Sequence, residues 1–276
     1  MVKKKKLKKI LLATGISLLL LTIIFFLWSI PKLQVTKYTI DSPKVNAEVK
    51  IVVISDLHAS EYGKNQKPLI SAIKKQNPDL ILMTGDIIDE TRSTKPVEIL
   101  FNGIKNLCPM YYIYGNHEQP LDRKPRAYEF MTSYGVGVLE EQYAEEIING
   151  QKIHICGLRD PQDPVAPDTW QGGLTYLSDQ VQDGVYTILL SHRPHFTKYY
   201  KQTKFDLILC GHSHGGQWRI PFINQGLYAP DEGLFPKYDG GKYDLGTPTM
   251  IVSRGLCKNY VPRFNNRPEI IAITLK

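Results

Sequence analysis

The chain has 276 residues, of which 42% are hydrophobic, enough for one large domain or two small domains with a buried core. Its net charge is +7, but six of the charges are lysines before residue 10, which leaves 28 basic against 27 acidic residues in the rest. The body of the protein has no basic excess, so its charge argues against a nucleic-acid partner.

Residues 10–30 form one long apolar run without a charge. About 21 such residues can span a bilayer about 30 Å thick, and the run is longer than the apolar core of a cleaved signal peptide. We therefore expect a single-pass signal anchor in the cell membrane, with residues 1–9 as a basic cytoplasmic tail and the remaining domain outside the cytoplasm. Residues 31–48 would form a linker or an entry strand, and one domain would occupy residues 49–276.

From Val49 onward, apolar strands alternate with helical stretches. The uninterrupted Ile/Val run at residues 51–54 is typical of a strand buried on both faces in a parallel sheet. The alternation predicts a layered α/β domain. Further strands are expected at residues 80–83, 110–114, 152–156, 186–190, 207–210 and 250–252, with helices around 68–76 and 96–106.

Polar side chains follow five of these strands directly, and five of the seven histidines are among them. Because the carboxyl ends of parallel strands meet at one edge of a sheet, we expect these side chains to converge. Seven nitrogen and oxygen donors exceed the four that a structural zinc needs. They suit two ions that share a carboxylate, clamp phosphate oxygens and activate water. The seven are Asp56, His58, Asp86, Asn116, His192, His212 and His214.

The motifs D-x-H, G-D-x-x-D, G-N-H-E, an isolated His after a strand, and G-H-x-H occur in this order. Over about residues 49–276 the chain resembles the calcineurin-like metallophosphoesterase family. The stretches GHSHGGQWRIP, LFPKY and SRG followed by RFNNRPEI resemble its membrane-anchored bacterial branch. Some relatives in or near that branch hydrolyse the pyrophosphate of UDP-2,3-diacylglucosamine.

The resemblance implies a four-layer α/β/β/α sandwich, here preceded by one transmembrane helix, and two divalent metal ions, with manganese, zinc and iron all compatible with the donors. It also implies a role for each site residue. Asp56, His58 and His214 would hold the first ion, and Asn116, His192 and His212 the second, with Asp86 as the bridge. His117 would act as a general acid or stabilise the transition state, and Asp89 would orient His117.

Other residues allow two interpretations. Asp89 could instead stabilise a turn or cap a helix, and we expect Glu118 to cap a helix or face solvent. Arg254 and Arg267 could bind phosphate or form structural salt bridges. His154 is expected on a surface face, His195 at a helix start, and the cysteines in the core as small apolar side chains. The aromatic stretch at residues 218–243 could form a lip over the site or ordered surface.

We therefore predict a membrane-anchored phosphodiesterase or pyrophosphatase, with a lipid-linked or UDP-diacylglucosamine-like ester as a candidate substrate. One alternative is a nucleotide or nucleic-acid phosphodiesterase, against which the near-neutral domain argues. Another is a metal-binding adaptor without turnover, against which the intact pair His117 and Asp89 argues. No obligate protein partner is readable from the sequence.

Overall fold

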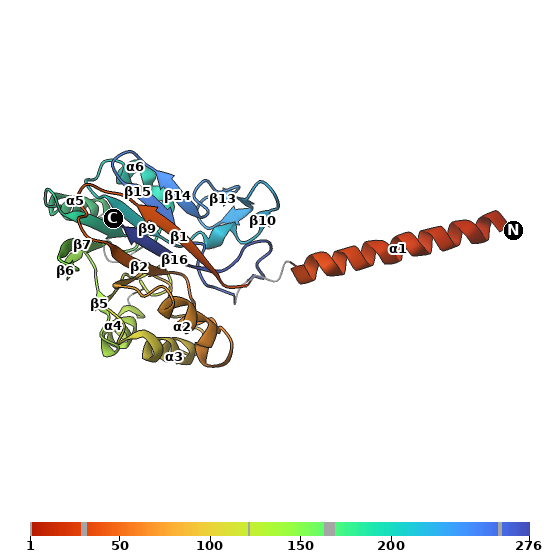
Figure 1. The fold of residues 1–276 in the computed structure, drawn as a ribbon, viewed down its shortest axis with the longest axis horizontal. Coiled ribbons are helices and arrows are strands. Elements are labelled where there is room, and N and C mark those ends of the chain that lie inside the picture. Colours follow the sequence, from red (N-terminus) through yellow and green to blue (C-terminus); the bar gives the residue numbers. More distant parts are fainter. Residues whose placement is uncertain (1, 29–31, 121, 163–168, 259–260) are drawn as a thin grey trace.

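The computed structural model describes residues 2–28, 32–120, 122–162, 169–258 and 261–276. Within these ranges the chain builds two six-stranded sheets with helices on their outer faces (Figure 1). The helices are α1 (Val2–Trp28), α2 (Lys67–Lys74), α3 (Lys95–Ile104), α4 (Lys124–Ser133), α5 (Trp170–Asp179) and α6 (Thr197–Tyr200), with short 3₁₀ helices η1 (Lys64–Gln66), η3 (Pro194–Phe196) and η4 (His214–Gly216).

The first sheet has the strand order β1-β16-β2-β3-β4-β5. All its neighbours are parallel except β16 and β2. Its strands are β1 (Gln34–Ile40), β2 (Val49–Ile54), β3 (Leu80–Met83), β4 (Met110–Tyr112), β5 (Gly137–Val138) and β16 (Glu269–Leu275).

The second sheet has the order β14-β15-β9-β8-β7-β6, parallel in the middle and antiparallel at both edges. Its strands are β6 (Gln142–Ile148), β7 (Gln151–Gly157), β8 (Tyr186–Leu190), β9 (Leu207–Cys210), β14 (Gly241–Asp244) and β15 (Thr249–Val252). Two small hairpins pair β10 (Arg219–Ile220) with β11 (Gln225–Gly226) and β12 (Tyr228–Ala229) with β13 (Gly233–Leu234).

Alternation along the strands builds three apolar layers. In β2, Ile51 and Val53 face the second sheet, where they pack with Ile188 and Leu209. Because successive side chains point to opposite faces of a sheet, Val52 and Ile54 face α2, α3 and α4 instead. On the far side, α5 and α6 cover the outer face of the second sheet. The central strands are thus buried on both faces, which explains their uninterrupted apolar runs.

The predicted transmembrane anchor is wrong. A span needs about 20 consecutive, predominantly apolar residues. α1 runs as one helix from Val2 to Trp28, so the lysines before residue 10 lie on the same helix as the apolar run. Within the described ranges no helix is both long enough and apolar enough to cross a bilayer. Residues 29 and 30, the end of the predicted anchor, and residue 31, the start of the predicted linker, lie outside the described residues. The cell-membrane location and the outward-facing topology depended on this anchor and are withdrawn with it.

The segment expected to be a linker or an entry strand contains β1. This strand pairs with β16 in parallel register from Gln34↔Glu269 to Ile40↔Leu275. The sandwich therefore begins before Val49, and the last strand of the chain lies between β1 and β2 in the first sheet.

Candidate metal centre

The loops that follow the strands are hydrogen-bonded to one another at the carboxyl edge of the sandwich. The backbone N–H of Asp56 donates to Gly85 O at 3.0 Å, and that of His58 donates to Asp86 O at 2.9 Å. The backbone N–H of His212, from the second sheet, donates to Asp56 Oδ1 at 2.9 Å. The two sheets therefore bring their motifs to a single place.

Two glycines in these loops are required by close packing. A Cβ on Gly115 would lie 2.1 Å from Asp86 Oδ1, and a Cβ on Gly211 would lie 1.9 Å from Ser55 Oγ. Both distances are far below van der Waals contact, so neither position accommodates a side chain without displacing the carboxylate or its neighbour.

Five of the predicted ligands have a left-handed backbone. Their φ angles lie between 45° and 66°, a region that costs a non-glycine residue about 1–2 kcal/mol. Such conformations persist where the surrounding structure enforces them, and they cluster at functional sites. The five residues are Asp56, His58, Asp86, His212 and His214.

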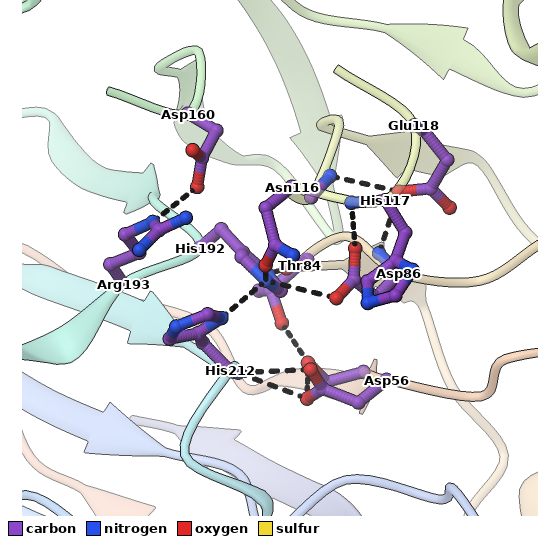
Figure 2. A network of polar contacts seen from close by, with 12 residues as sticks. Asp56, Thr84, Asp86, Asn116, His117, Glu118, Asp160, His192, Arg193 and His212 are labelled. Atoms are coloured by element: carbon purple, nitrogen blue, oxygen red, sulfur yellow. Dashed lines mark hydrogen bonds and ion pairs between the residues drawn. The ribbon is translucent and has the colours of Figure 1, made fainter. Parts of the chain in front are cut away.

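Four donor atoms converge at His192, as Figure 2 shows. His192 Nε2 lies 3.2 Å from Asp86 Oδ2, 3.1 Å from Asn116 Oδ1 and 3.1 Å from His212 Nδ1. These atoms come from the ends of β3, β4, β8 and β9. Two imidazole nitrogens, a carboxylate and an amide oxygen form a donor set that suits a divalent transition metal. They are the second predicted set, together with the predicted bridge.

The outer nitrogens of both imidazoles are hydrogen-bonded, which determines which nitrogen faces the cluster. His192 Nδ1 donates to Thr84 O at 2.7 Å. His212 Nε2 donates to Asp231 Oδ2 at 2.8 Å. A metal-binding histidine is held in this way by a carbonyl or a carboxylate. His192 Nε2 and His212 Nδ1 are thereby turned toward each other.

The charge of Asp86 dominates the titration of His192. Burial lowers the pKa of His192, but Asp86 outweighs it and raises that pKa to about 10. The pKa of Asp86 is held well below its usual value by His192, although burial alone would raise it. A histidine binds a metal only when its ring is neutral, so a cation bound here would replace the proton on His192 Nε2.

One member of the first predicted set, His58, approaches the same Asp86 oxygen as His192 does. His58 Nε2 is 3.5 Å from Asp86 Oδ2, and His214 Nε2 is 4.0 Å from Asp56 Oδ1. The His58 and His214 rings are stacked, with centroids 5.3 Å apart. Burial lowers the pKa of His58 to about 4, so its ring is neutral, the form that binds a metal.

Among the residues that the structure describes, three groups of donors are compact enough to hold an ion, with all ligand atoms of each group within 4.8 Å of one another. One is Asp86, His192 and His212, and another is His58, Asp86 and His117. The third joins His58 and His214 to Cys257, which was not among the predicted ligands. These donors suit divalent ions such as manganese, zinc or iron, which the sequence analysis predicted. Asp86 belongs to two of the groups, as a bridging carboxylate would.

His117 lies beside the cluster at its open side. Its ring is 4.7 Å from that of His58 in an edge-on arrangement, and its side chain is 28% exposed. Its Nδ1 lies 2.9 Å from Glu90 Oε2, a contact that the sequence did not predict. Burial lowers the pKa of His117, but Asp86 and then Glu90 outweigh it and raise that pKa above the ordinary value.

Asp89, predicted to orient His117, has its Oδ2 3.8 Å from His58 Nδ1. Its Oδ1 accepts hydrogen bonds from the backbone N–H and the hydroxyl of Thr91 at 2.8 and 2.7 Å. The orienting role of Asp89 stays a prediction. The observed contacts add a turn-stabilising role for this carboxylate, and they make Glu90 a carboxylate partner of the His117 ring.

Glu118 is buried beneath the loop after β3, with 1% of its surface exposed, so the expectation of a solvent-facing side chain is wrong. Its carboxylate accepts four backbone N–H groups at 2.7 to 3.0 Å. Burial and then the charge of Asp86 raise the pKa of Glu118 to about 7, although the hydrogen bonds lower it. The side chain positions Asp86 without facing the metal donors. The four donors are Asp86, Ile87, Ile88 and Gly115.

A second support lies behind His212, on a carboxylate whose side chain is 33% exposed. Asp231 accepts from His212 and also pairs with Arg193, whose Nε donates to Asp160 Oδ2 at 2.8 Å. Asp231 belongs to the long segment between η4 and β14, and that segment thereby contacts the site through one carboxylate. No motif marks Asp231 in the sequence, because it meets His212 only through the tertiary fold.

Several secondary predictions can now be judged. His154 is 1% exposed and bonded to Glu145 Oε1 at 2.7 Å, so its predicted surface position is wrong. Arg254 forms a structural salt bridge with Glu269, and Arg267 is exposed. His195 lies in η3, as predicted.

In the aromatic stretch, Trp218, Phe222, Tyr228 and Phe235 are exposed, whereas Tyr238 packs in the core. Of the cysteines, Cys156 and Cys210 lie in the core as expected.

Comparison with known proteins agrees with this geometry. The family model of the calcineurin-like phosphoesterases matches residues 49–216. The uncharacterized metallophosphoesterase YkuE of Bacillus subtilis is 32% identical over 254 residues, which cover 88% of this chain and 86% of the relative. The phosphodiesterase YaeI of Escherichia coli is 26% identical over 235 residues, 83% of each chain.

Among solved structures, the fold resembles that of the Thermus thermophilus sulfate thiohydrolase SoxB. The TM-score is 0.51 at 12% identity, and the match covers 82% of this chain and 56% of that one. At this identity the likeness concerns the fold alone. The family model, the relatives and the clustered histidines and aspartates together show that the chain belongs to the calcineurin-like phosphoesterase family, whose members are metal-dependent hydrolases of phosphoric esters.

Proposed function

We propose that the protein is a phosphodiesterase that works with two divalent metal ions bridged by Asp86. The observation that carries the proposal is the convergence of four donor atoms. The oxygens of Asp86 and Asn116 and the Nδ1 of His212 all lie 3.1–3.2 Å from His192 Nε2. A second group around His58 reaches the same carboxylate. A relative of similar length is named a phosphodiesterase, which supports the substrate class.

Each ion would have its own histidine pair. His58 and His214, with Asp56, would hold the first ion, and His192 and His212, with Asn116, would hold the second. When bound, such a pair of ions neutralises the charge on the phosphate and lowers the pKa of water at the site. Asp86 lies between the two groups and supplies the negative charge that keeps two cations close together.

His117 is the candidate general acid. Its raised pKa keeps a larger share of the ring protonated near neutral pH. Its side chain is 28% exposed, so an ester can reach it. We propose that His117 donates its proton to the oxygen that leaves phosphorus, while water supplies the oxygen that replaces it.

The lipid-linked substrate loses its main support, because it was argued from an anchor that would hold the domain at a membrane. The substrate class that we propose is a phosphodiester.

The test uses the full chain and bis-p-nitrophenyl phosphate, with added manganese or zinc. We expect metal-dependent release of nitrophenol and about two ions per active chain by elemental analysis. Asp86→Ala should abolish the release and lower the metal content, whereas Asp183→Ala, at an exposed position, should change neither. Full activity with one ion or fewer per chain would contradict the two-ion proposal. No turnover of any diester by the metal-loaded protein would leave a non-catalytic metal-binding protein as the better account.

A further inference from the structure

The donor group around the first ion contains a residue outside the predicted ligand set. Cys257 lies on the loop after β15, and its Sγ lies within 4.8 Å of a nitrogen of His58 and of a nitrogen of His214. The thiol is 5% exposed. When zinc is tetrahedral, a sulfur and a nitrogen bound to it are about 3.6 Å apart and two nitrogens are about 3.3 Å apart. The three donor atoms, which lie within 4.8 Å of one another, would therefore have to approach by up to about 1–1.5 Å to share one ion.

The buried guanidinium of Arg263 is a second, independent observation at the same place. Its Nε donates to Cys257 O at 2.7 Å. Its Nη1 and Nη2 are buried and find no hydrogen-bond partner in the described part of the chain. A buried guanidinium is costly unless a negative charge lies near it. Part of that charge comes from Asp56, and a thiolate at Cys257 would add to it.

The hydrogen bond from Arg263 Nε to Cys257 O also places the guanidinium next to the first donor group. The cation of Arg263 therefore lies close enough to this group to stabilise an anionic ligand there.

We propose that Cys257 binds, as a thiolate, the ion held by His58 and His214. When the bond from Sγ to the metal forms, the thiol proton passes to solvent, and Arg263 offsets the added negative charge. This inference concerns the ligand set of the site on which the proposed function rests, and its test needs no turnover.

A thiolate changes which metal the first position prefers. Sulfur ligands favour zinc and other softer ions, whereas carboxylate oxygens suit manganese. The second position, with Asn116 and no sulfur among its donors, should be less selective. The protein should therefore hold zinc more firmly than manganese at the first position, although both ions can occupy the second.

The spectrum of the cobalt-loaded protein tests the proposal directly. Cobalt(II) bound to a thiolate gives a near-ultraviolet charge-transfer band that nitrogen and oxygen ligands do not produce. We expect this band when the full-length, metal-stripped protein is titrated with cobalt(II). We also expect bound cobalt or zinc to protect Cys257 from alkylation, as read by mass spectrometry. A protein that binds cobalt without the band, or that leaves Cys257 equally reactive, would overturn the proposal even if no variant could be prepared.

Two variants identify the sulfur. Cys257→Ser should remove the band and weaken the tighter zinc site by at least about tenfold, since the loss of an outer contact to a ligand alone costs 10- to 100-fold. Manganese affinity should change much less. Cys108→Ser is the matched control, because Cys108 is half-buried and precedes β4, at the end of the strand opposite the site. A band that survives in Cys257→Ser, or disappears in Cys108→Ser, would show that the assignment is wrong.

These outcomes are independent of the proposed phosphodiesterase activity. Loss of the band in Cys257→Ser supports the thiolate ligand whether or not a diester is hydrolysed. Conversely, hydrolysis without a band supports the proposed function and rejects Cys257 as a ligand.

Discussion

Replacing Glu118 by alanine should destabilise the protein more than the loss of any exposed carboxylate. The side chain accepts four backbone N–H groups, two on each oxygen. Each buried N–H left without a partner costs about 1–3 kcal/mol. Water can enter the space vacated by the side chain and satisfy some of the donors, so we expect a loss of about 3–5 kcal/mol out of a typical stability of about 5–15 kcal/mol.

Glu118→Gln should lose only part of this stability, because each carboxylate oxygen accepts a different pair of N–H groups. One oxygen accepts from Asp86 and Gly115, and the other accepts from Ile87 and Ile88. An amide keeps one of these oxygens and places an NH₂ group against the other two donors. The glutamine variant should therefore lose about half as much stability as the alanine variant, roughly 2 kcal/mol. Both should bind metal more weakly, because the loop that carries Asp86 is no longer held.

Urea unfolding followed by circular dichroism measures these differences, and elemental analysis measures the retained metal. Glu232→Ala is the matched control, because Glu232 also accepts two backbone N–H groups but is only partly buried. Its loss should cost less than about 1 kcal/mol, since water replaces the exposed hydrogen bonds. If Glu118→Ala were as stable as Glu232→Ala, the argument from four buried hydrogen bonds would be refuted.

Three further changes test the site. Asp231→Ala should weaken metal binding about 10- to 100-fold by calorimetry, because it removes the carboxylate that holds His212. His117→Ala should lower kcat by about 10²–10⁴ with metal content unchanged, and by less for a nitrophenyl ester than for an alkyl ester, whose leaving oxygen needs a proton. Gly115→Ala should abolish activity, because the added Cβ would lie 2.1 Å from Asp86 Oδ1 and displace that carboxylate.

For each of these three substitutions, one result would contradict the prediction. Loss of both ions in His117→Ala would make His117 a ligand, not an acid. Unchanged metal affinity in Asp231→Ala would mean that its contact does not hold His212 in place. For the glycine, Gly172→Ala in α5 is the control, because a Cβ there meets nothing within 4 Å and should leave activity intact.

The strand pattern and the order of the motifs are local properties, so the sequence alone was sufficient to predict them. An uninterrupted run such as Leu80–Met83 is apolar on both faces of its strand, and the structure buries all four residues between layers. A polar residue directly after such a strand must lie at the edge of the sheet. That rule placed Asp86, His192 and His212 together although more than 100 residues separate the first from the others.

The apolar run near the amino end shows where such reading fails. Its composition predicted a membrane span, but the described helix α1 joins the run to the lysines before it, and no described helix meets the requirement for crossing a bilayer. His154 failed for a different reason. Its strand position does not reveal that β6 supplies Glu145 as a partner and covers the ring.

What only the tertiary structure decided are the contacts between segments that share no motif. Glu118 turns inward because the loop after β3 presents three N–H groups to it and Gly115, after β4, presents a fourth. Asp231 and Cys257 reach the metal donors from segments that carry no recognisable pattern. A sequence specifies which strands are buried through the periodicity of apolar side chains, which is short-range. It does not specify which distant loop supplies a counter-charge, because that depends on how two whole sheets pack against each other.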